Sequence, residues 1–431
     1  MKVYFETYGC SYNFADTEYM KSLIKGEPSS LKDADIIIIN TCTVKNKTIN
    51  NLRKRFKLIH KENPHGKIIV TGCIPQASKN SIFEISEMKK FSLLGPNNLN
   101  KINYLINSKI KKDILEEDEE TIKEKEGRLN LDSHKNIEII PISKGCLSKC
   151  TFCQTKLARG SLRSFKPEEI LERVRRAVSK GTKIIYLTSQ DNGCYGFDFK
   201  GRDYKLPDLI KDLCEIKGEF KIRIGMANPI HLKKIILPLL KIMKNEKVFK
   251  FLHIPIQSGS NKVLKDMRRG NSVEEYKEII LIAEKEIPKI TISTDIIVGF
   301  PTETNIDFQD TLNLLDETKP SIVNRAKFSA RPGTLASKMK QISTNTITNR
   351  SKILNKKITQ ISKELNEKWI NWEGEVIIET KKKKGSCVAR NLSYKPIVIK
   401  KEIKEGKKLR VKIIGVTTFH LIGEIIETTN K

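Results

Sequence analysis

The chain lacks long hydrophobic runs. Its longest apolar runs, such as 36–39 and 296–298, fall far short of the roughly 18 residues that a membrane-spanning helix needs. The first ten residues, MKVYFETYGC, place Glu6 where a signal peptide would carry its apolar stretch. We therefore expect a cytoplasmic protein with no membrane partner.

Acidic residues are scarce relative to basic ones. The 431 residues include 80 Lys plus Arg against 51 Asp plus Glu, so the formal charge is +29. This imbalance favours a polyanionic partner, with nucleic acid as the first candidate. Apolar residues at 38% and charged residues at 30% exclude collagen-like and wholly disordered classes. The length suggests about three domains.

Cysteines are also scarce, and their number bears on whether they form disulfides. There are nine, and an odd number does not make a complete disulfide framework. In a reducing cytoplasm, metal ligation or catalysis explains clustered cysteines better than disulfides do.

Residues 1–107 alternate short buried strands with helical stretches, which predicts an open parallel α/β domain. Three apolar runs there each lead to a cysteine: Cys10, Cys42 and Cys73. One such cysteine would be most simply a small buried apolar residue. Because ligands bind at the carboxyl ends of strands in open α/β sheets, three cysteines in that position predict one shared site.

The rest of the chain divides into a linker and two domains. Residues 108–131 are charged and poor in apolar residues, which is typical of a linker. In 132–367, six strand-like runs alternate with amphipathic helical patterns, so we predict a partial (β/α)6 barrel with its chemistry at the C-terminal face. Residues 370–431 carry short β-branched runs broken by glycines, which predicts a small antiparallel β-barrel.

The small C-terminal barrel carries a cluster of basic residues: Lys381, Lys382, Lys383, Lys384 and Arg390. In a chain this basic we interpret them as RNA-binding residues, the alternative being a solvated basic hairpin.

The strongest motif is Cys146-Leu-Ser-Lys-Cys150-Thr-Phe-Cys153, directly after the first barrel strand. Three cysteines at this CxxxCxxC spacing can ligate three irons of a [4Fe-4S] cluster and leave the fourth iron open for a small molecule. Structural zinc would need a fourth ligand, and the nearest candidates, His134 and Cys194, lack zinc-type spacing. Ferredoxins use CxxC spacings with a fourth cysteine, so simple electron transfer also fits this motif poorly.

This loop resembles that of the radical S-adenosylmethionine (SAM) superfamily, in which the open iron binds SAM. The resemblance narrows to the methylthiotransferases through ETYGC, NTCTV and TGC in the N-terminal domain, and through LHIPIQSGSNKVLKDMRRG, TDIIVGFPTET and RPGT further on. It implies that Cys10, Cys42 and Cys73 ligate a second [4Fe-4S] cluster. The C-terminal barrel is similar to the TRAM domain, an RNA-binding module of these enzymes.

Two further stretches, CTFCQTKLARGSLRSF and LTSQDNGCYGFD, resemble the archaeal and eukaryotic branch of the family. That branch is implied to add a methylthio group to carbon 2 of N6-threonylcarbamoyladenosine at position 37 of tRNA, next to the anticodon. Carbon 2 of adenine is an unactivated C–H, so radical chemistry is needed. The reaction also implies an electron donor and a sulfur donor as partners.

By resemblance and position, Ser189, Gln190 and Asp191 follow the second barrel strand, where the superfamily contacts the amino group of SAM; ordinary polar loop residues are the alternative. Arg159 is a candidate for binding a phosphate or a carboxylate, or else for a structural salt bridge.

His253 and Gln257 are candidates for the barrel mouth or for satisfied core groups. Cys194, Cys214 and Cys387 lack cluster spacing, and we interpret them as structural.

Two other functions stay open at this point. Within the family, the substrate could be isopentenyl-adenosine in tRNA or a ribosomal protein. In a different class, the chain could be a non-catalytic RNA-binding protein with a structural metal, although that interpretation leaves six placed cysteines unexplained.

Overall fold

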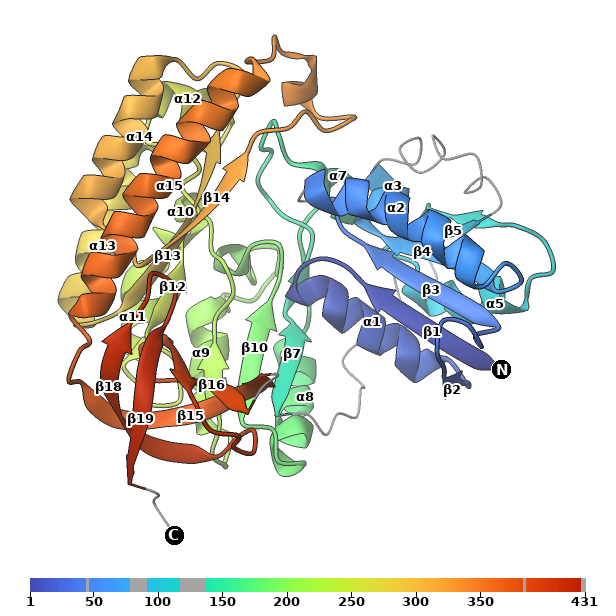
Figure 1. Cartoon of the computed structure of the whole chain (residues 1–431), viewed down its shortest axis with the longest axis horizontal. Helices are drawn as coiled ribbons and strands as arrows, with labels where there is room; N and C mark the ends of the chain where they lie inside the picture. Colours follow the sequence, from blue (N-terminus) through green and yellow to red (C-terminus); the bar gives the residue numbers. More distant parts are fainter. Residues whose placement is uncertain (44–45, 78–90, 117–135, 383–384, 428–431) are drawn as a thin grey trace. The chain divides into compact units, whose positions relative to one another are not determined.

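The computed structural model describes residues 1–43, 46–77, 91–116, 136–382 and 385–427, and its chain divides into two compact units (Figure 1). The first, here called the N-terminal unit, comprises Met1–Leu131, Ser143–Glu169 and Ser329–Lys338. The second, the barrel unit, comprises Asp132–Ile142, Ile170–Phe328 and Met339–Lys431. No helix in the described stretches is both long and apolar enough to span a membrane.

A parallel sheet of six strands forms the centre of the N-terminal unit, in the order β2-β1-β3-β4-β5-β6. The strands are β1 (Lys2–Thr7), β2 (Glu27–Pro28), β3 (Ile36–Thr41), β4 (Lys67–Gly72), β5 (Ser92–Leu94) and β6 (Asp113–Ile114). The helices are α1 (Ser11–Leu23), α2 (Asn46–Glu62), α3 (Cys73–Ala77) and α5 (Ile102–Asn107), with the 3₁₀ turn η2 (Leu99–Lys101). The predicted open parallel domain is confirmed.

The isoleucine run of β3 shows why this sheet is buried on both faces. Ile37 and Ile39 pack in one core cluster with residues of α2, whereas Ile36 and Ile38 pack in another with residues of α1 and α5. A strand covered on both sides needs apolar residues at every position, so it lacks the polar alternation of a half-exposed strand.

Strand β6 lies in the stretch 108–131 that we predicted as a linker, and it pairs with β5 through Leu93 and Leu94. Two pairing residues in a charged stretch give no strand signal of their own. Residues 117–131 of that predicted linker lie outside the described residues.

Three shorter segments complete the N-terminal unit: the strand pair β8 (Ser143–Lys144) and β9 (Arg163–Ser164), the helix α7 (Gln154–Arg159), and the 3₁₀ turn η5 (Leu335–Lys338). The CxxxCxxC loop therefore belongs to the same unit as the three N-terminal cysteines.

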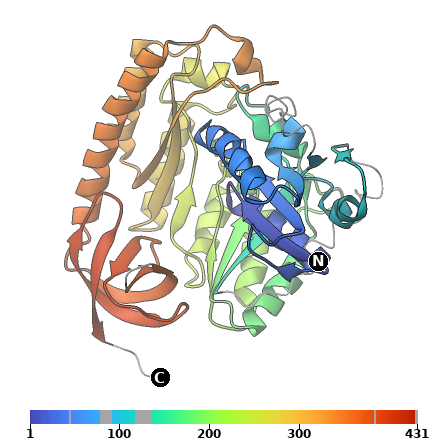
Figure 2. The same cartoon turned by 45° about the vertical axis from the view of Figure 1, so that its right-hand side comes forward.

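Six parallel strands form the half-barrel of the barrel unit, as predicted (Figure 2). They are β7 (Ile137–Pro141), β10 (Ile184–Thr188), β11 (Lys221–Arg223), β12 (Phe251–His253), β13 (Thr291–Val298) and β14 (Ile322–Lys327). Ile222 bridges to Val248 and so links the β7-β10-β11 half to the β12-β13-β14 half.

Helices follow the strands in βα order. They are α8 (Pro167–Ser179), α9 (Leu206–Glu215), α10 (Pro229–Leu232), α11 (Ile236–Met243), α12 (Asn261–Asp266), α13 (Val273–Glu286), α14 (Asn305–Thr318) and α15 (Thr344–Glu367), with the 3₁₀ turn η4 (Asn192–Cys194). Capping boxes begin α13 at Ser272 and α14 at Thr304, each satisfying two backbone N–H groups. Helix α8 begins at Pro167, whose fixed φ suits the first turn of a helix.

Five strands close a second, smaller barrel in the order β15-β16-β17-β19-β18. They are β15 (Glu373–Lys382), β16 (Ser386–Arg390), β17 (Pro396–Ile399), β18 (Lys408–Val416) and β19 (Leu421–Glu427). Closure removes the exposed sheet edges. The predicted small barrel is confirmed, and its pairs are antiparallel except β17 with β19, which is parallel.

One hydrophobic cluster joins the two barrels. Ile377 and Tyr394 of the small barrel pack with Ile184, Phe249 and Phe251 of the half-barrel. Tyr394 lies 4.9 Å from Phe249 and 5.0 Å from Phe251 between ring centroids. The small barrel is therefore part of the core of the half-barrel rather than a module joined only by the chain.

Candidate functional site

The three N-terminal cysteines lie at the carboxyl ends of neighbouring strands. Cys10 follows β1 and precedes α1, Cys42 follows β3 directly, and Cys73 follows β4 as the first residue of α3. Strands β1, β3 and β4 are adjacent in the sheet, so these ends meet at one edge. Cys10 is exposed, whereas Cys42 and Cys73 are buried.

Two glycines let these loops approach one another. A Cβ placed on Gly9 would lie 2.8 Å from the Cβ of Cys42, and one on Gly72 would lie 2.2 Å from the carbonyl oxygen of Thr41. Both glycines have positive φ angles, 130° and 92°, which other residues rarely adopt. The residue before Cys10 and the residue before Cys73 must therefore each be glycine for the loops to pack against the Cys42 loop.

Two asparagines fix the loops to each other. The side-chain amide of Asn13 donates to Oδ1 of Asn40 at 3.1 Å and to the carbonyl of Thr41 at 2.9 Å. The amide of Asn40 donates in return to the carbonyl of Asn13 at 2.8 Å. The thiol of Cys10 donates to Oδ1 of Asn13 at 3.2 Å. This buried network holds the first two cysteine loops in a single arrangement.

The loop of Cys146, Cys150 and Cys153 begins at a tight turn. Gly145 has a φ of 73°, and a Cβ there would collide with the carbonyl oxygen of Ser161 at 1.9 Å. All three cysteines are half-buried. Cys153 precedes α7 directly, and burial raises the pKa of its thiol.

The two sets of cysteines lie close together within the N-terminal unit. Helix α3, which begins at Cys73, packs against α7, which begins one residue after Cys153. The amide of Gln154 donates to the carbonyl of Pro332 at 3.0 Å and approaches that of Ala77 at 3.5 Å. These interactions tie the CxxxCxxC loop to the end of the helix that carries Cys73.

Arg159 supports this arrangement through a buried ion pair. Its Nη2 lies 2.7 Å from Oδ2 of Asp16, both side chains are buried, and its guanidinium stacks 4.5 Å from the ring centroid of Tyr12. Burial alone would lower the pKa of Arg159, but the charge of Asp16 holds that pKa above its ordinary value. Of the two predicted roles, the structural salt bridge is the one present here, and the binding of a phosphate or carboxylate stays a prediction.

The three residues predicted to contact SAM differ in their burial and hydrogen bonds. Asp191 is buried, and its Oδ1 accepts N–H groups from Gly193 and Asn228, both at 3.0 Å. Its Oδ2 lies 2.6 Å from Nδ1 of His231. The carboxylate thus stabilises the loop after β10, as expected for an ordinary polar loop residue, and its contact to SAM stays a prediction.

Ser189 and Gln190 keep suitable positions after β10. Gln190 is half-buried, and within the described stretches the Ser189 hydroxyl has no hydrogen-bond partner. Cys194, interpreted from the sequence as structural, is buried and donates to the carbonyl of Asp191 at 3.2 Å.

The other residues interpreted as structural vary in burial. Cys387 is buried in the core of the small barrel, whereas Cys214 is half-buried.

Polar side chains of three neighbouring half-barrel strands contact one another. Nε2 of His253, the last residue of β12, lies 3.0 Å from Oδ1 of Asp295 on β13, to which the amide of Asn324 on β14 also donates at 2.9 Å. Burial would raise the pKa of Asp295, but the hydrogen bond with His253 gives a net lowering. Gln257 is buried and pairs with β13 through its backbone, so it acts in the core.

Sequence reasoning did not single out Arg223, the last residue of β11. Its guanidinium lies over Phe251, the first residue of β12, and over Tyr394 of the small barrel, so it belongs to the contact between the two barrels.

The predicted RNA-binding residues are not equivalent. Lys381 and Lys382 are exposed, and Nζ of Lys381 is 3.4 Å from Glu402. Arg390 is enclosed instead: its Nε donates to Glu379 at 2.8 Å and its guanidinium stacks on Tyr394 at 4.2 Å. These contacts give Arg390 a structural role, and its contact to RNA stays a prediction. Lys383 and Lys384 lie outside the described residues.

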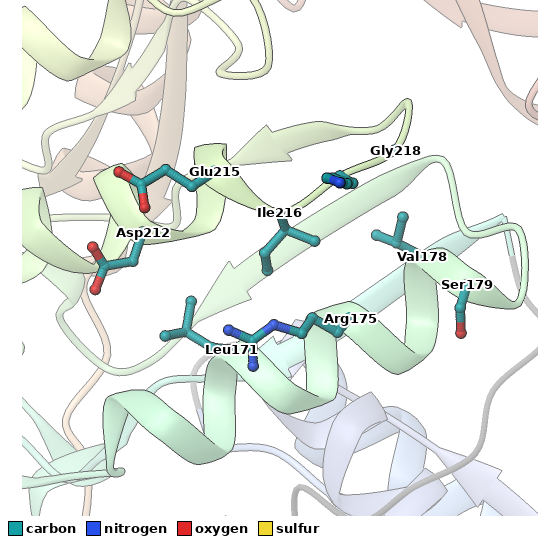
Figure 3. A pocket seen from close by; sticks show the side chains of 9 residues that line it. Leu171, Arg175, Val178, Ser179, Asp212, Glu215, Ile216 and Gly218 are labelled. Atoms are coloured by element: carbon teal, nitrogen blue, oxygen red, sulfur yellow. The ribbon is translucent and has the colours of Figure 1, made fainter.

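A groove lies between α8 and the end of α9, lined by residues such as Leu171, Arg175, Asp212 and Ile216 (Figure 3). None of the predicted site residues lines it, so no catalytic or binding role is assigned to it.

Comparison with known proteins agrees with this geometry. Residues 140–315 match the model of the radical SAM superfamily, residues 2–93 that of the uncharacterized protein family UPF0004, and residues 373–426 that of the TRAM domain. The fold resembles that of a radical S-adenosylmethionine methyltransferase, TsrM from Kitasatospora setae, with a TM-score of 0.56 at 9% identity over 78% of this chain and 75% of that one.

Full-length relatives are more specific. A Pyrococcus horikoshii protein is 37% identical over 99% of this chain and 100% of its own, and an Archaeoglobus fulgidus protein is 38% identical over 99% of both. Both carry the name "Probable threonylcarbamoyladenosine tRNA methylthiotransferase". A Drosophila melanogaster relative named threonylcarbamoyladenosine tRNA methylthiotransferase is 32% identical over 99% of this chain and 78% of its own.

The half-barrel and the superfamily match define a radical SAM enzyme, a class that works with an iron–sulfur cluster and SAM. Within that class, the chain belongs to the threonylcarbamoyladenosine tRNA methylthiotransferase family.

Proposed function

We propose that this member of the family adds a methylthio group to carbon 2 of N6-threonylcarbamoyladenosine at position 37 of tRNA, using SAM and two [4Fe-4S] clusters. In this proposal Cys146, Cys150 and Cys153 hold one cluster, and the cysteines of the N-terminal sheet edge hold the other. The observation that carries it is the packing of α3 on α7, because these two helices begin at the third cysteine of one set and just after the third cysteine of the other.

The residues present fit two clusters better than two single ions. All nine cysteines lie in described stretches, and each carries a thiol rather than a disulfide. Among the described residues, Asp191, Cys194 and His231 are a group of three potential ligands whose atoms all lie within 4.8 Å of one another. Neither set of three cysteines in the described stretches is drawn together as tightly. A zinc ion draws its ligand atoms into one tight tetrahedron, whereas cysteines of a cluster bind separate irons and stand further apart.

When bound, a reduced cluster supplies the electron that cleaves SAM, which is the radical chemistry that an unactivated C–H requires. The protein's own part is positional. Asn13 and Asn40 hold the loops of Cys10 and Cys42 together, and Gln154 holds the CxxxCxxC loop beside α3. The Ser189 hydroxyl, placed after β10, is available to accept from the amino group of SAM.

The tRNA is bound largely through charge. The chain carries a formal charge of +29, and Lys381 and Lys382 present cations on the exposed surface of the small barrel. An anticodon loop is single-stranded, so its bases can be splayed out while phosphates are held by such cations. An electron donor and a sulfur donor complete the set of partners.

The experiment is an assay of iron, acid-labile sulfide and zinc on protein purified without oxygen, followed by nucleoside mass spectrometry of tRNA from cells with and without the gene. About eight irons per chain and a 2-methylthio nucleoside that depends on the gene support the proposal. About four irons would overturn the second cluster, and zinc without iron would move the function to a metal-stabilised RNA-binding protein. A 2-methylthio group on isopentenyl-adenosine would overturn the choice of nucleoside.

A further inference from the structure

Arg159 follows the CxxxCxxC loop in sequence, but its guanidinium lies beside the other set of cysteines. It is the last residue of α7. Its ion pair with Asp16 and its stacking on Tyr12 both reach α1, the helix that begins directly after Cys10. Helix α3, which begins at Cys73, packs against α7 from another direction. Elements on two sides therefore place this cation near the N-terminal cysteines.

The ion pair leaves most of the guanidinium unused. Nη2 lies 2.7 Å from Asp16, whereas Nε and Nη1 are buried and find no hydrogen-bond partner in the described stretches of the chain. The side chain is 1% exposed, so bulk water does not supply the missing acceptors. Arg350 and Arg390 differ, because each donates from two of its nitrogens to protein oxygens. Buried donors without an acceptor are costly, so Nε and Nη1 indicate an acceptor that protein oxygens do not provide.

The sulfur of Cys73 is the acceptor that fits this position. Burial raises the pKa of the Cys73 thiol, and the charge of Arg159 is the strongest influence that opposes the rise. The charge of Asp16 acts on the same thiol in the other direction, but less strongly. At Cys73 the ion pair therefore acts as a cation. The charge of Cys10 also reaches Cys73, so two of the three N-terminal thiols share these surroundings.

A cation at this place has a chemical consequence for an iron–sulfur cluster. Thiolates bound to iron still accept hydrogen bonds, and such bonds, together with the net charge, set the reduction potential of a cluster. Three cysteines leave one iron open, and an anionic ligand on that iron adds negative charge to a buried site. Negative charge in a buried site is costly unless a cation or hydrogen-bond donors lie beside it.

We propose that Arg159 donates hydrogen bonds to the sulfur of Cys73 in the cluster-loaded protein, and that its cation favours an anionic sulfur ligand on the open iron. The inference rests on the proposed function, which assigns a cluster to Cys10, Cys42 and Cys73. Methanethiolate is the anionic form of the methylthio group, so Arg159 favours the group that the proposed reaction transfers over neutral ligands. Arg159 is thus a positioning residue that follows the cysteines of one cluster and acts on the other.

The test measures ligand binding to the N-terminal cluster by electron paramagnetic resonance of the reduced protein, and it does not depend on turnover. Every protein is the full chain with Cys150→Ala, so that only the N-terminal cysteines hold a cluster. Sodium methanethiolate is the anionic probe, and imidazole is the neutral one. This parent is compared with three variants: Asp16→Asn, Asp16→Asn with Arg159→Gln, and Lys21→Gln. Lys21 lies in an exposed pair on the same helix as Asp16, so its variant removes a cation away from the cysteines.

We expect Asp16→Asn with Arg159→Gln to bind methanethiolate about tenfold more weakly than the parent, the effect of losing a charged hydrogen bond. Its affinity for imidazole should not change. Asp16→Asn alone should bind methanethiolate at least as tightly as the parent, because it keeps the guanidinium and loses an anion. Lys21→Gln should match the parent with both probes. The reduction potential should be lowest in the double variant and highest in Asp16→Asn, because nearby positive charge favours the added electron.

The inference is overturned if the double variant keeps the parent's affinity for methanethiolate. It is also overturned if methanethiolate and imidazole are weakened equally, which is the result of a purely structural role. If the double variant holds no cluster, Asp16→Leu with Arg159→Met takes its place, since it leaves no buried charge. If that variant holds no cluster either, Arg159 is needed for assembly, and its proposed effect on the ligand is overturned.

Failure of the proposed function looks different. A Cys150→Ala parent without iron would remove the second cluster, and this inference would fall with it. A parent with about four irons, whose ligand affinities do not depend on Arg159, would overturn the inference alone.

Discussion

Nη2 of Arg159 lies 2.7 Å from Oδ2 of Asp16, and both side chains are buried between α7 and α1. This ion pair joins the segment that follows the CxxxCxxC loop to the helix that follows Cys10. The pair therefore connects the two cysteine-bearing segments of the site.

Removing one partner of this pair should destabilise the N-terminal unit. Asp16→Asn leaves the Arg159 charge buried without its anion, and we expect a loss of about 3–5 kcal/mol in the free energy of unfolding. The double variant Asp16→Leu with Arg159→Met should recover part of that loss, since no charge is then buried. Lys21→Met, which removes a cation from an exposed pair on the same helix, is the control for chemical denaturation and should change little. Equal stability of Asp16→Asn and the control would contradict the prediction.

Replacing cysteines of the two sets should separate the two half-reactions. Cys150→Ala should abolish cleavage of SAM, whereas Cys42→Ala should preserve cleavage and abolish thiolation of tRNA. Each variant should retain about four of the eight irons. The products 5′-deoxyadenosine and methylthiolated nucleoside are both measured by mass spectrometry. A Cys42→Ala protein that still thiolates tRNA would refute the role of the second cluster.

Gly72→Ala should remove the N-terminal cluster without touching a cysteine. A methyl group there would meet the carbonyl of Thr41 at 2.2 Å, so the loop that carries Cys73 must shift away from the loop that carries Cys42. We expect the iron content to fall from about eight to about four. Gly181→Ala is a matched control because Gly181 has nearly the same φ, 93° against 92°, but open space around it. The prediction fails if both variants lose iron equally.

Charge removal from the small barrel should affect tRNA binding at some positions and stability at others. The double variant Lys381→Ala with Lys382→Ala should weaken binding and reduce the slope of log affinity against log salt by about one for each phosphate that the variant no longer neutralises. Arg390→Gln should leave that slope unchanged but lower the melting temperature, because Glu379 then loses its ion pair. A reduced slope in Arg390→Gln would show that this residue reaches RNA after all.

Stability should rise with pH through the titration of a buried lysine. Burial lowers the pKa of Lys395 to about 8, and its Nζ donates to Oδ1 of Asn366 at 3.2 Å. Between that pKa and the ordinary value near 10.5, the unfolded chain binds the proton and the folded chain does not, so folding is favoured as pH increases. From pH 7.5 to 9.5 the wild type should gain about 2 kcal/mol relative to Lys395→Met.

Chemical denaturation at several pH values measures this difference, in which the effect of other groups cancels. If the free energy of unfolding changed with pH by the same amount in both proteins, the lowered pKa of Lys395 would be contradicted.

The parts of the fold that could be predicted from the sequence are those with local signals. The isoleucine run of β3 and the cysteine that follows it are visible as a buried strand and its end. The start of α8 at Pro167 is likewise indicated by local sequence, since proline suits the first turn of a helix. Strand β6 could not be predicted, because two residues in a charged stretch become a strand only by pairing with β5.

The candidate site could likewise be predicted only where the signal is local in sequence. Strand ends and the CxxxCxxC spacing predict two groups of cysteines, whereas the partners of Arg159, Asp191 and Arg390 depend on interactions between distant segments. Arg390 is part of a basic surface by its sequence neighbours, yet Glu379 and Tyr394 enclose it. Charge alone cannot separate a cation that faces solvent from one that a partner buries.

The cluster shared by the two barrels has a consequence for synthesis. Tyr186 and Ile184 belong to the second strand of the half-barrel, but their packing partner Tyr394 is more than 200 residues further along the chain. At about 5–20 residues per second, a ribosome needs roughly 10–40 s to supply it. Phe249 and Phe251 are made within that interval and stay exposed on the nascent half-barrel until Tyr394 follows, so the growing chain is prone to aggregation until its last domain emerges.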